Sequence, residues 1–157
     1  MSSVLNHKPG FPDRILVIDD LPIIYLAFLE IFRSINSSVT VEYSSNIFSA
    51  LSSPTFANTR FDLVIAGSLQ GDLSGPLQQT VTELKKKFGE PKIMLYSGDY
   101  DPEIIRHMTE IGIDAYVHRF ESIEEIGKTY CQLANGGSYV SEIFHTLYYE
   151  YREGLGK

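Results

Sequence analysis

The sequence is poor in cysteine and in basic residues, and it has no long apolar run. Cys131 is the only cysteine, so no disulfide can form within the chain, which fits a reducing compartment. Lysine and arginine total 13 against 20 aspartates and glutamates, and the net charge of −7 argues against nucleic-acid binding by this segment. Residues 1–13 are polar and lack the apolar stretch of a signal peptide, and no apolar run reaches membrane-spanning length. We therefore expect a cytoplasmic protein without a membrane partner.

The pattern along the 157 residues alternates between two kinds of segment, within a length typical of one domain. Short apolar runs suit strands that are buried on both faces, and longer amphipathic stretches suit helices. The expected strands cover residues 15–18, 39–43, 63–66, 93–96 and 115–118. The expected helices cover residues 21–35, 45–51, 76–88, 101–111 and 122–135. Five strands that alternate with five helices predict a doubly wound α/β fold with a five-stranded parallel sheet.

Segments at both ends extend beyond this pattern. Residues 1–13 are interpreted as an N-terminal arm, because proline and glycine interrupt regular structure there. Residues 14–138 form the expected domain, and residues 139–157 are expected to form a C-terminal linker helix with Ser141 as its N-cap. Apolar residues from Phe144 onward fall on one face of that helix.

The first expected helix is apolar on nearly every side over residues 22–32. A helix on the surface of an α/β domain normally keeps a polar stripe. One interpretation is deep burial with some tolerated exposure. The other is that a partner, or the C-terminal helix of this chain, covers one face, for which the tyrosines near residue 150 are well suited.

Four segments carry a resemblance to a known family. They are RILVIDDLP (14–22), FDLVIAGSLQGDLSG (61–75), KIMLYSG (92–98) and GIDAYVHRF (112–120). Over residues 14–141 the chain resembles the receiver domain of bacterial two-component response regulators, which implies a flavodoxin-like (βα)5 fold, phosphorelay signalling and control of transcription. In that family two carboxylates hold Mg²⁺, and a third, at the end of the third strand, accepts a phosphoryl group from a histidine kinase.

The resemblance assigns roles to six positions. They are Asp19 and Asp20 (the acidic pair that holds Mg²⁺), Gly67 (the phosphoacceptor position), Ser97 (the hydroxyl residue), Tyr116 (the aromatic switch residue) and Arg119 (the position of the family's lysine). Glycine has no carboxylate, so the resemblance implies loss of phosphorylation. Without that third anionic ligand we expect weak Mg²⁺ binding at best, and we expect no other cofactor.

Each of these residues also has a plain structural interpretation. Asp20 can cap a helix while Asp19 is solvated, Ser97 can bond to nearby backbone, and Tyr116 can be a half-buried strand residue. Arg119 can lie exposed at a strand end, or it can form a permanent charge pair with the acidic residues in place of Mg²⁺ or phosphate.

No neighbouring residue is a convincing substitute for the missing nucleophile. Asp62 begins the third strand, at the opposite end of the sheet, and Asp72 lies well into the following loop. Ser68 would need an activating base. Gly71 and Phe120 replace two prolines of the family pattern, which are two further departures from it.

These observations predict a pseudo-receiver that is not an enzyme and acts through contact with proteins, such as a histidine kinase or another regulator. Homodimerisation, through the first helix or the face between the fourth and fifth helices, is a further hypothesis. The alternative function is the N-terminal regulatory domain of a DNA-binding regulator with a LuxR-like helix-turn-helix domain, which the YVS segment at residues 139–141 favours. A flavin carrier is disfavoured, because Asp19 and Asp20 would repel a phosphate group.

Overall fold

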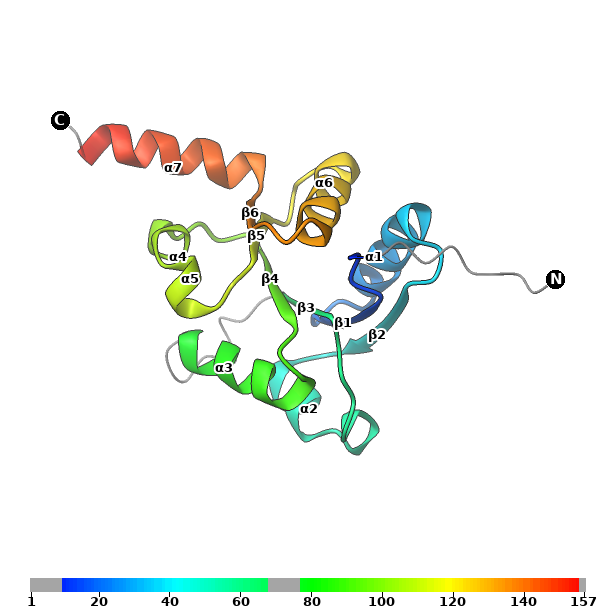
Figure 1. The fold of residues 1–157 in the computed structure, drawn as a ribbon. Coiled ribbons are helices and arrows are strands. Elements are labelled where there is room, and N and C mark those ends of the chain that lie inside the picture. The colour runs from blue at the N-terminus through cyan, green and yellow to red at the C-terminus, as the bar shows by residue number, and fades with distance from the viewer. Residues whose placement is uncertain (1–9, 68–76, 156–157) are drawn as a thin grey trace.

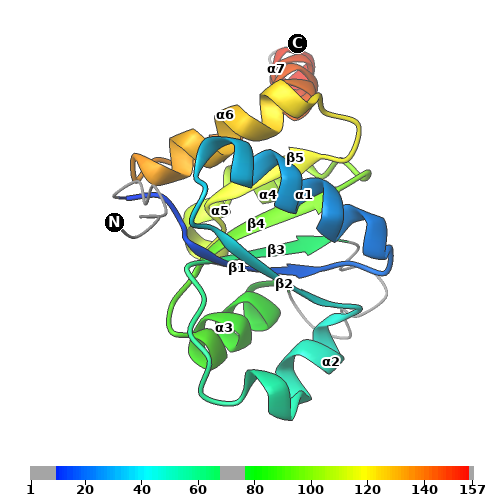
Figure 2. The same ribbon diagram turned by 90° about the vertical axis from the view of Figure 1, so that its right-hand side faces the viewer.

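The computed structural model describes residues 10–67 and 77–155 of the chain. A single parallel sheet lies between two layers of helices (Figures 1 and 2). Its strands are β1 (Arg14–Ile18), β2 (Thr40–Ser44), β3 (Leu63–Gly67), β4 (Lys92–Ser97), β5 (Ala115–His118) and β6 (Tyr139–Val140). They lie in the order β2-β1-β3-β4-β5-β6, and every neighbouring pair is parallel. This order is that of a doubly wound α/β fold.

The helices connect successive strands and then extend beyond the last one. They are α1 (Pro22–Ile35), α2 (Ile47–Ser52), α3 (Leu77–Phe88), α4 (Pro102–Arg106), α5 (Met108–Ile111), α6 (Ile123–Ala134) and α7 (Glu142–Leu155), with a 3₁₀ turn at Pro54–Phe56. Figure 2 shows α1 and α6 together on one face of the sheet, with α2 and α3 on the other.

The core has two apolar layers, because successive side chains of a strand point to opposite faces. Ile15 and Val17 of β1 belong to the layer under α1 and α6, where Phe28 and Tyr130 are fully buried. Their neighbours on β1 belong to the second layer, which contains Phe144 of α7. Burial on both faces explains why the strands are continuous apolar runs.

The prediction of five strands was wrong by one, because Tyr139 and Val140 form a sixth strand beside β5. Two residues are too short to show a strand period in the sequence. The C-terminal helix begins at Glu142, directly after Ser141, and the N–H of His145 donates to the Ser141 carbonyl at 2.8 Å, as the predicted N-cap position requires. The Ser141 side chain is fully buried, and its hydroxyl accepts a hydrogen bond from the backbone N–H of His118 at 3.0 Å.

Two other local predictions were also wrong. Asp20 does not cap α1: the N-cap residue is Leu21, and its backbone N–H donates to Asp19 Oδ1 at 2.9 Å. The single helix expected over residues 101–111 consists of α4 and α5, with a break at His107, whose backbone leaves the helical region (φ −120°, ψ 24°). Asp101 caps the first of these by accepting the N–H of Glu103.

The C-terminal helix does not cover α1. It packs against β5 and α4, on the opposite side of the molecule from α1 (Figure 1). Ile23 and Leu26 of α1 are consequently 68% and 56% exposed. The predicted N-terminal arm lies mostly outside the described residues. No helix among the residues described is both long and apolar enough to span a bilayer.

The buried tyrosines predict how stability depends on alkaline pH. Burial raises the pKa of Tyr116 and of Tyr130 to about 12, from 10.0 in an unfolded chain. The folded state therefore holds more protons than the unfolded state above pH 10, so the free energy of unfolding falls as the pH rises from about 10 toward 12. Urea unfolding at several pH values measures this slope.

The control is Tyr130→Phe, which removes one of the two groups. Its stability should fall less steeply over the same pH range than that of the native protein. Equal slopes for the two proteins would contradict the assignment of Tyr130 as a buried, protonated group.

Candidate functional site

The carboxyl ends of β1, β3 and β5 bring three of the predicted site residues together. Ile18 of β1 pairs with Ala66 of β3, so Asp19 and Gly67 follow side by side at the same edge of the sheet. Arg119 follows β5, and its backbone N–H donates to the carbonyl of Ser97 at 3.0 Å. In a parallel sheet this edge is where the connecting loops build a site.

An ion pair joins Asp19 to Arg119. Arg119 Nη2 lies 2.6 Å from Asp19 Oδ2, and the two side chains are 18% and 1% exposed. Asp19 Oδ1 accepts the N–H of Leu21. Burial raises the pKa of Asp19 above its ordinary value, whereas the N–H of Leu21 and the Arg119 guanidinium oppose this shift. The guanidinium and the backbone amide thus offset the free-energy cost of burying the carboxylate away from water.

Gly67 lies against this ion pair. A Cβ atom at position 67 would overlap Asp19 Oδ2 and would lie 3.0 Å from Arg119 Nη2 and 3.1 Å from Asp19 Cγ. The ion pair therefore fills the space that a side chain would need. A side chain at position 67 would require Asp19 or Arg119 to move.

The residues present do not fit the Mg²⁺ that the resemblance implies. Both carboxylate oxygens of Asp19 already accept hydrogen bonds, one of them from a guanidinium cation. Asp20 is exposed. Across residues 10–67 and 77–155, no three His, Cys, Asp or Glu side chains come together as a metal site. A divalent cation would have to displace Arg119 before Asp19 could bind it.

Ser97 and Tyr116 lie near this edge but make other contacts. The Ser97 hydroxyl accepts the N–H of Asp99 at 3.0 Å, which is the local backbone bond that small hydroxyl residues commonly form. Tyr116 is fully buried, so its interpretation as a half-buried strand residue was wrong. Its hydroxyl donates to the carbonyl of Asp99 at 2.6 Å and accepts the N–H of Asp101 at 3.1 Å.

The sequence analysis missed two tyrosines that hold the ion pair in place. The Tyr96 ring lies under the guanidinium of Arg119, 5.2 Å from ring centre to carbon, and its hydroxyl donates to the Arg119 carbonyl. The Tyr43 hydroxyl donates to the Asp19 carbonyl at 2.6 Å. Both lie one residue before the end of a strand, and that position could have indicated side chains at the site edge.

Two of the residues considered as nucleophiles, Ser68 and Asp72, lie outside the described residues, and so does Gly71, which replaces a proline of the family pattern. Asp62 lies at the opposite edge of the sheet, where it accepts the backbone N–H groups of Asp13 and Arg14 at 3.1 and 2.9 Å.

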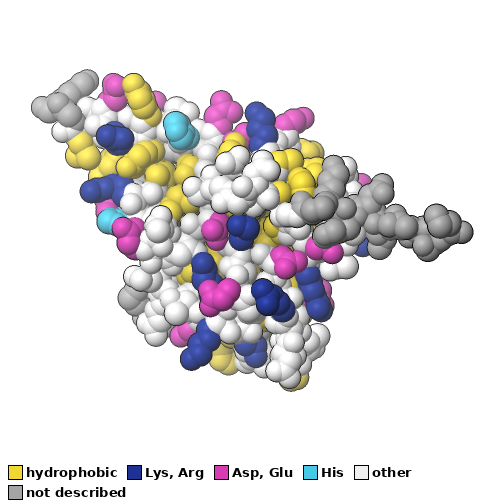
Figure 3. Space-filling view, viewed as in Figure 1, with side chains coloured by type: hydrophobic (Ala, Val, Ile, Leu, Met, Phe, Trp, Pro, Cys, Tyr) yellow, Lys and Arg dark blue, Asp and Glu magenta, His cyan; other side chains and the backbone are white. Residues whose placement is uncertain are grey.

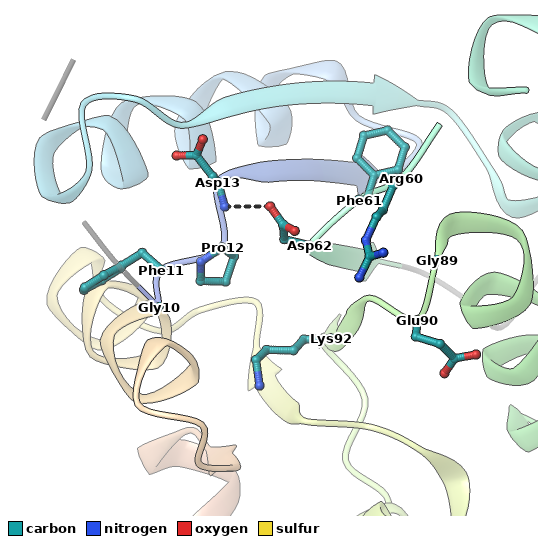
Figure 4. Close-up of a pocket in the computed structure, with 10 residues that line it drawn as sticks. All are labelled: Gly10, Phe11, Pro12, Asp13, Arg60, Phe61, Asp62, Gly89, Glu90 and Lys92. Carbon is teal, nitrogen blue, oxygen red and sulfur yellow. Dashed lines mark hydrogen bonds between the residues drawn. The ribbon is translucent and has the colours of Figure 1, made fainter. Parts of the chain in front are cut away.

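A surface hollow lies beside Asp62, at the amino ends of β1, β3 and β4 (Figure 4). It is lined by cations and anions alike, with Arg60 and Lys92 near Asp62 and Glu90. The mixture of charges favours no ligand of one sign, and the hollow is separated from the ion pair by the length of the strands.

Comparison with known proteins supports the fold. No family model and no curated protein matches the sequence. Among solved structures, the chain is similar to the isolated REC domain of RcsB from Salmonella enterica serovar Typhimurium, with 17% identity, a TM-score of 0.68, and coverage of 87% of this chain and 98% of that one.

Two LuxR-family regulators are also similar. One, from Aurantimonas sp. SI85-9A1, has 17% identity and a TM-score of 0.70, and the match covers 90% of this chain and 98% of that one. The other, a DNA-binding response regulator from Silicibacter pomeroyi, has 19% identity and a TM-score of 0.65, with coverage of 81% and 95%. The predicted flavodoxin-like receiver fold is confirmed; identities this low show the fold alone.

The ion pair predicts a large effect of removing its cation. In Arg119→Met, Asp19 would keep a buried charge without a partner, so we expect a loss of about 3–5 kcal/mol in the free energy of unfolding near neutral pH. Urea unfolding measures it. The matched control is Arg33→Met, an exposed arginine in the last turn of α1, which should cost less than about 1 kcal/mol.

The difference in the free energy of unfolding between the native protein and Arg119→Met should become smaller at acid pH. Loss of the cation raises the pKa of Asp19 further, so protonation relieves the buried charge as the pH falls toward about 4. If the loss in the free energy of unfolding is the same at neutral and acid pH, the broken charge pair is not its cause.

Proposed function

We propose that this domain is a pseudo-receiver: a receiver-fold signalling domain that accepts no phosphoryl group and acts by binding proteins. One observation carries the proposal. The Asp19–Arg119 ion pair occupies the space over Gly67 where a receiver would hold its nucleophile and metal. An acyl phosphate needs a carboxylate at that position, and a metal to reduce repulsion between the carboxylate and the phosphoryl donor.

The ion pair also supplies a reason for the domain to hold one state. In a phosphorylated site, positive charge meets an added dianion, and the surrounding loops move in response. Here the positive charge of Arg119 is already neutralised by the carboxylate of Asp19 in the same chain. Separating the two would cost free energy, because the carboxylate is buried. Signalling then depends on which proteins the domain binds and not on a covalent change at this site.

Apolar side chains near the same edge support a role in protein contact. Leu21, Ile23 and Leu26 are exposed at the start of α1, and Phe120 and Ile123 are exposed between β5 and the start of α6. Grouped apolar exposure of this kind is typical of interaction surfaces. A histidine kinase or another regulator is the class of partner that receiver folds bind.

A second function is supported by the C-terminal segment and by the structural likeness. In this interpretation the domain is the regulatory part of a LuxR-like transcriptional regulator whose DNA-binding domain is not in this chain. The similar protein from Silicibacter pomeroyi is itself a DNA-binding response regulator. A longer reading frame that encodes a basic helix-turn-helix domain would favour this function.

Phosphoryl transfer can be tested by intact mass after incubation with acetyl phosphate and Mg²⁺. We expect no mass gain for the native protein. We also expect little for Gly67→Asp, because its side chain would collide with the ion pair. The double variant Gly67→Asp/Arg119→Lys restores the carboxylate and the family's lysine, and it should gain one phosphoryl group. A phosphorylated native protein would refute the proposal, and mapping the modified residue would identify the true nucleophile.

Self-association through α1 is testable by light scattering at micromolar concentration. One similar solved structure contains RcsB dimers bound to DNA, and the exposed start of α1 offers an apolar contact surface in this chain. We expect a dimer for the native protein and a monomer for Leu26→Glu, which places a charge in that surface. Phe48→Glu is the control, because Phe48 is 77% exposed on α2, on the other face of the sheet. A monomeric native protein would exclude the dimer.

A further inference from the structure

The segment that joins α6 to α7 is tied to the domain by several hydrogen bonds. At the start of α7, the N–H of Glu142 donates to Glu125 Oε2 at 2.9 Å, and the N–H of Ile143 donates to Glu121 Oε1 at 2.6 Å. Carboxylates in these places suit the positive end of the helix dipole. The N–H of Ser141 also donates to the carbonyl of Tyr116. The direction in which α7 leaves the domain is thus determined by the body of the domain.

Phe144, in the first turn of α7, is fully buried and makes the main apolar contact of this helix. Its ring stacks on Tyr116, with centroids 4.1 Å apart and planes 17° apart, and more loosely on Tyr100 at 5.9 Å. Figure 3 shows hydrophobic side chains gathered at the surface where α4 and α7 lie next to each other. Further along, Tyr149 and Leu155 are exposed, whereas Tyr148 and Tyr151 are half-buried and stack on each other.

Tyr116 contacts α7 and the loop after β4 at the same time. While its ring carries Phe144, its hydroxyl bonds to the carbonyl of Asp99 and to the N–H of Asp101. The same loop follows Ser97, the last residue of β4, whose carbonyl accepts the N–H of Arg119. A continuous set of contacts therefore runs from the ion pair, through the loop at residues 97–101, to the C-terminal helix.

We infer that Phe144 and Tyr116 couple the docking of α7 to the conformation of the loop at residues 97–101. When α7 is docked, Phe144 packs on the Tyr116 ring, and the Tyr116 hydroxyl forms hydrogen bonds with Asp99 and Asp101 of the loop. When α7 undocks, the Tyr116 ring becomes exposed and both hydrogen bonds to the loop are lost. A protein that binds the loop changes the docking of α7, and one that binds α7 changes the loop by the same free energy. The inference rests on the proposed signalling function.

Hydrogen–deuterium exchange on the full chain tests this coupling. We expect Phe144→Ala to speed exchange about tenfold or more both in α7 and in residues 99–106. Leu147→Ala is the matched control, a truncation in the same helix at a partly exposed position, and it should leave residues 99–106 unchanged. Faster exchange in α7 alone, or in neither segment, would overturn the inference.

A second variant keeps the test decisive if Phe144→Ala does not fold. Tyr116→Phe retains the ring that stacks on Phe144 and removes only the hydroxyl that holds the loop. Faster exchange in residues 99–106 together with α7 supports coupling, whereas faster exchange in residues 99–106 alone overturns it. Phosphoryl uptake by Gly67 variants is read separately, by mass, so failure of one proposal is distinguishable from failure of the other.

Discussion

The buried ion pair between Asp19 and Arg119 is the interaction on which the carboxyl edge of this domain depends. It joins residues 100 positions apart in the sequence and connects the ends of β1 and β5 across the middle of the sheet. A charged carboxylate that is 1% exposed is costly in free energy without such a partner. Glycine at position 67 leaves room for the pair, because a Cβ atom there would overlap the Asp19 carboxylate.

The ion pair has consequences beyond this edge of the sheet. In a metal-binding receiver, the charge of the site depends on bound Mg²⁺ and on the phosphoryl group, both of which come from solution. Here the compensating positive charge is Arg119 of the same chain, so the charge of Asp19 is neutralised without a bound ligand. Under the proposed function, regulation acts through protein-binding surfaces. The exposed apolar residues of α1 and the attachment of α7 through Phe144 are the two features that offer such surfaces.

Much of the site could be predicted from sequence, because the strands are short, regular and separated by family spacing. The positions of Asp19, Gly67 and Arg119 follow from counting along four segments, and a charge pair was one of the two interpretations of Arg119. The support from Tyr43 and Tyr96 could not be predicted this way. Their roles depend on neighbouring strands and on ring orientation, and both are properties of the assembled sheet.

The sequence by itself determined the alternation of strands and helices, the parallel sheet, and the absence of a side chain at position 67, because each is carried by local pattern or by residue identity. The tertiary structure alone decided that Asp19 pairs with Arg119, that Tyr139 and Val140 form a sixth strand, and that α7 packs on β5 and α4 and leaves α1 uncovered. The physical reason is the same in each case. These outcomes depend on which buried surfaces and charges meet after the chain has folded, and contacts between residues far apart leave no periodic trace in the sequence.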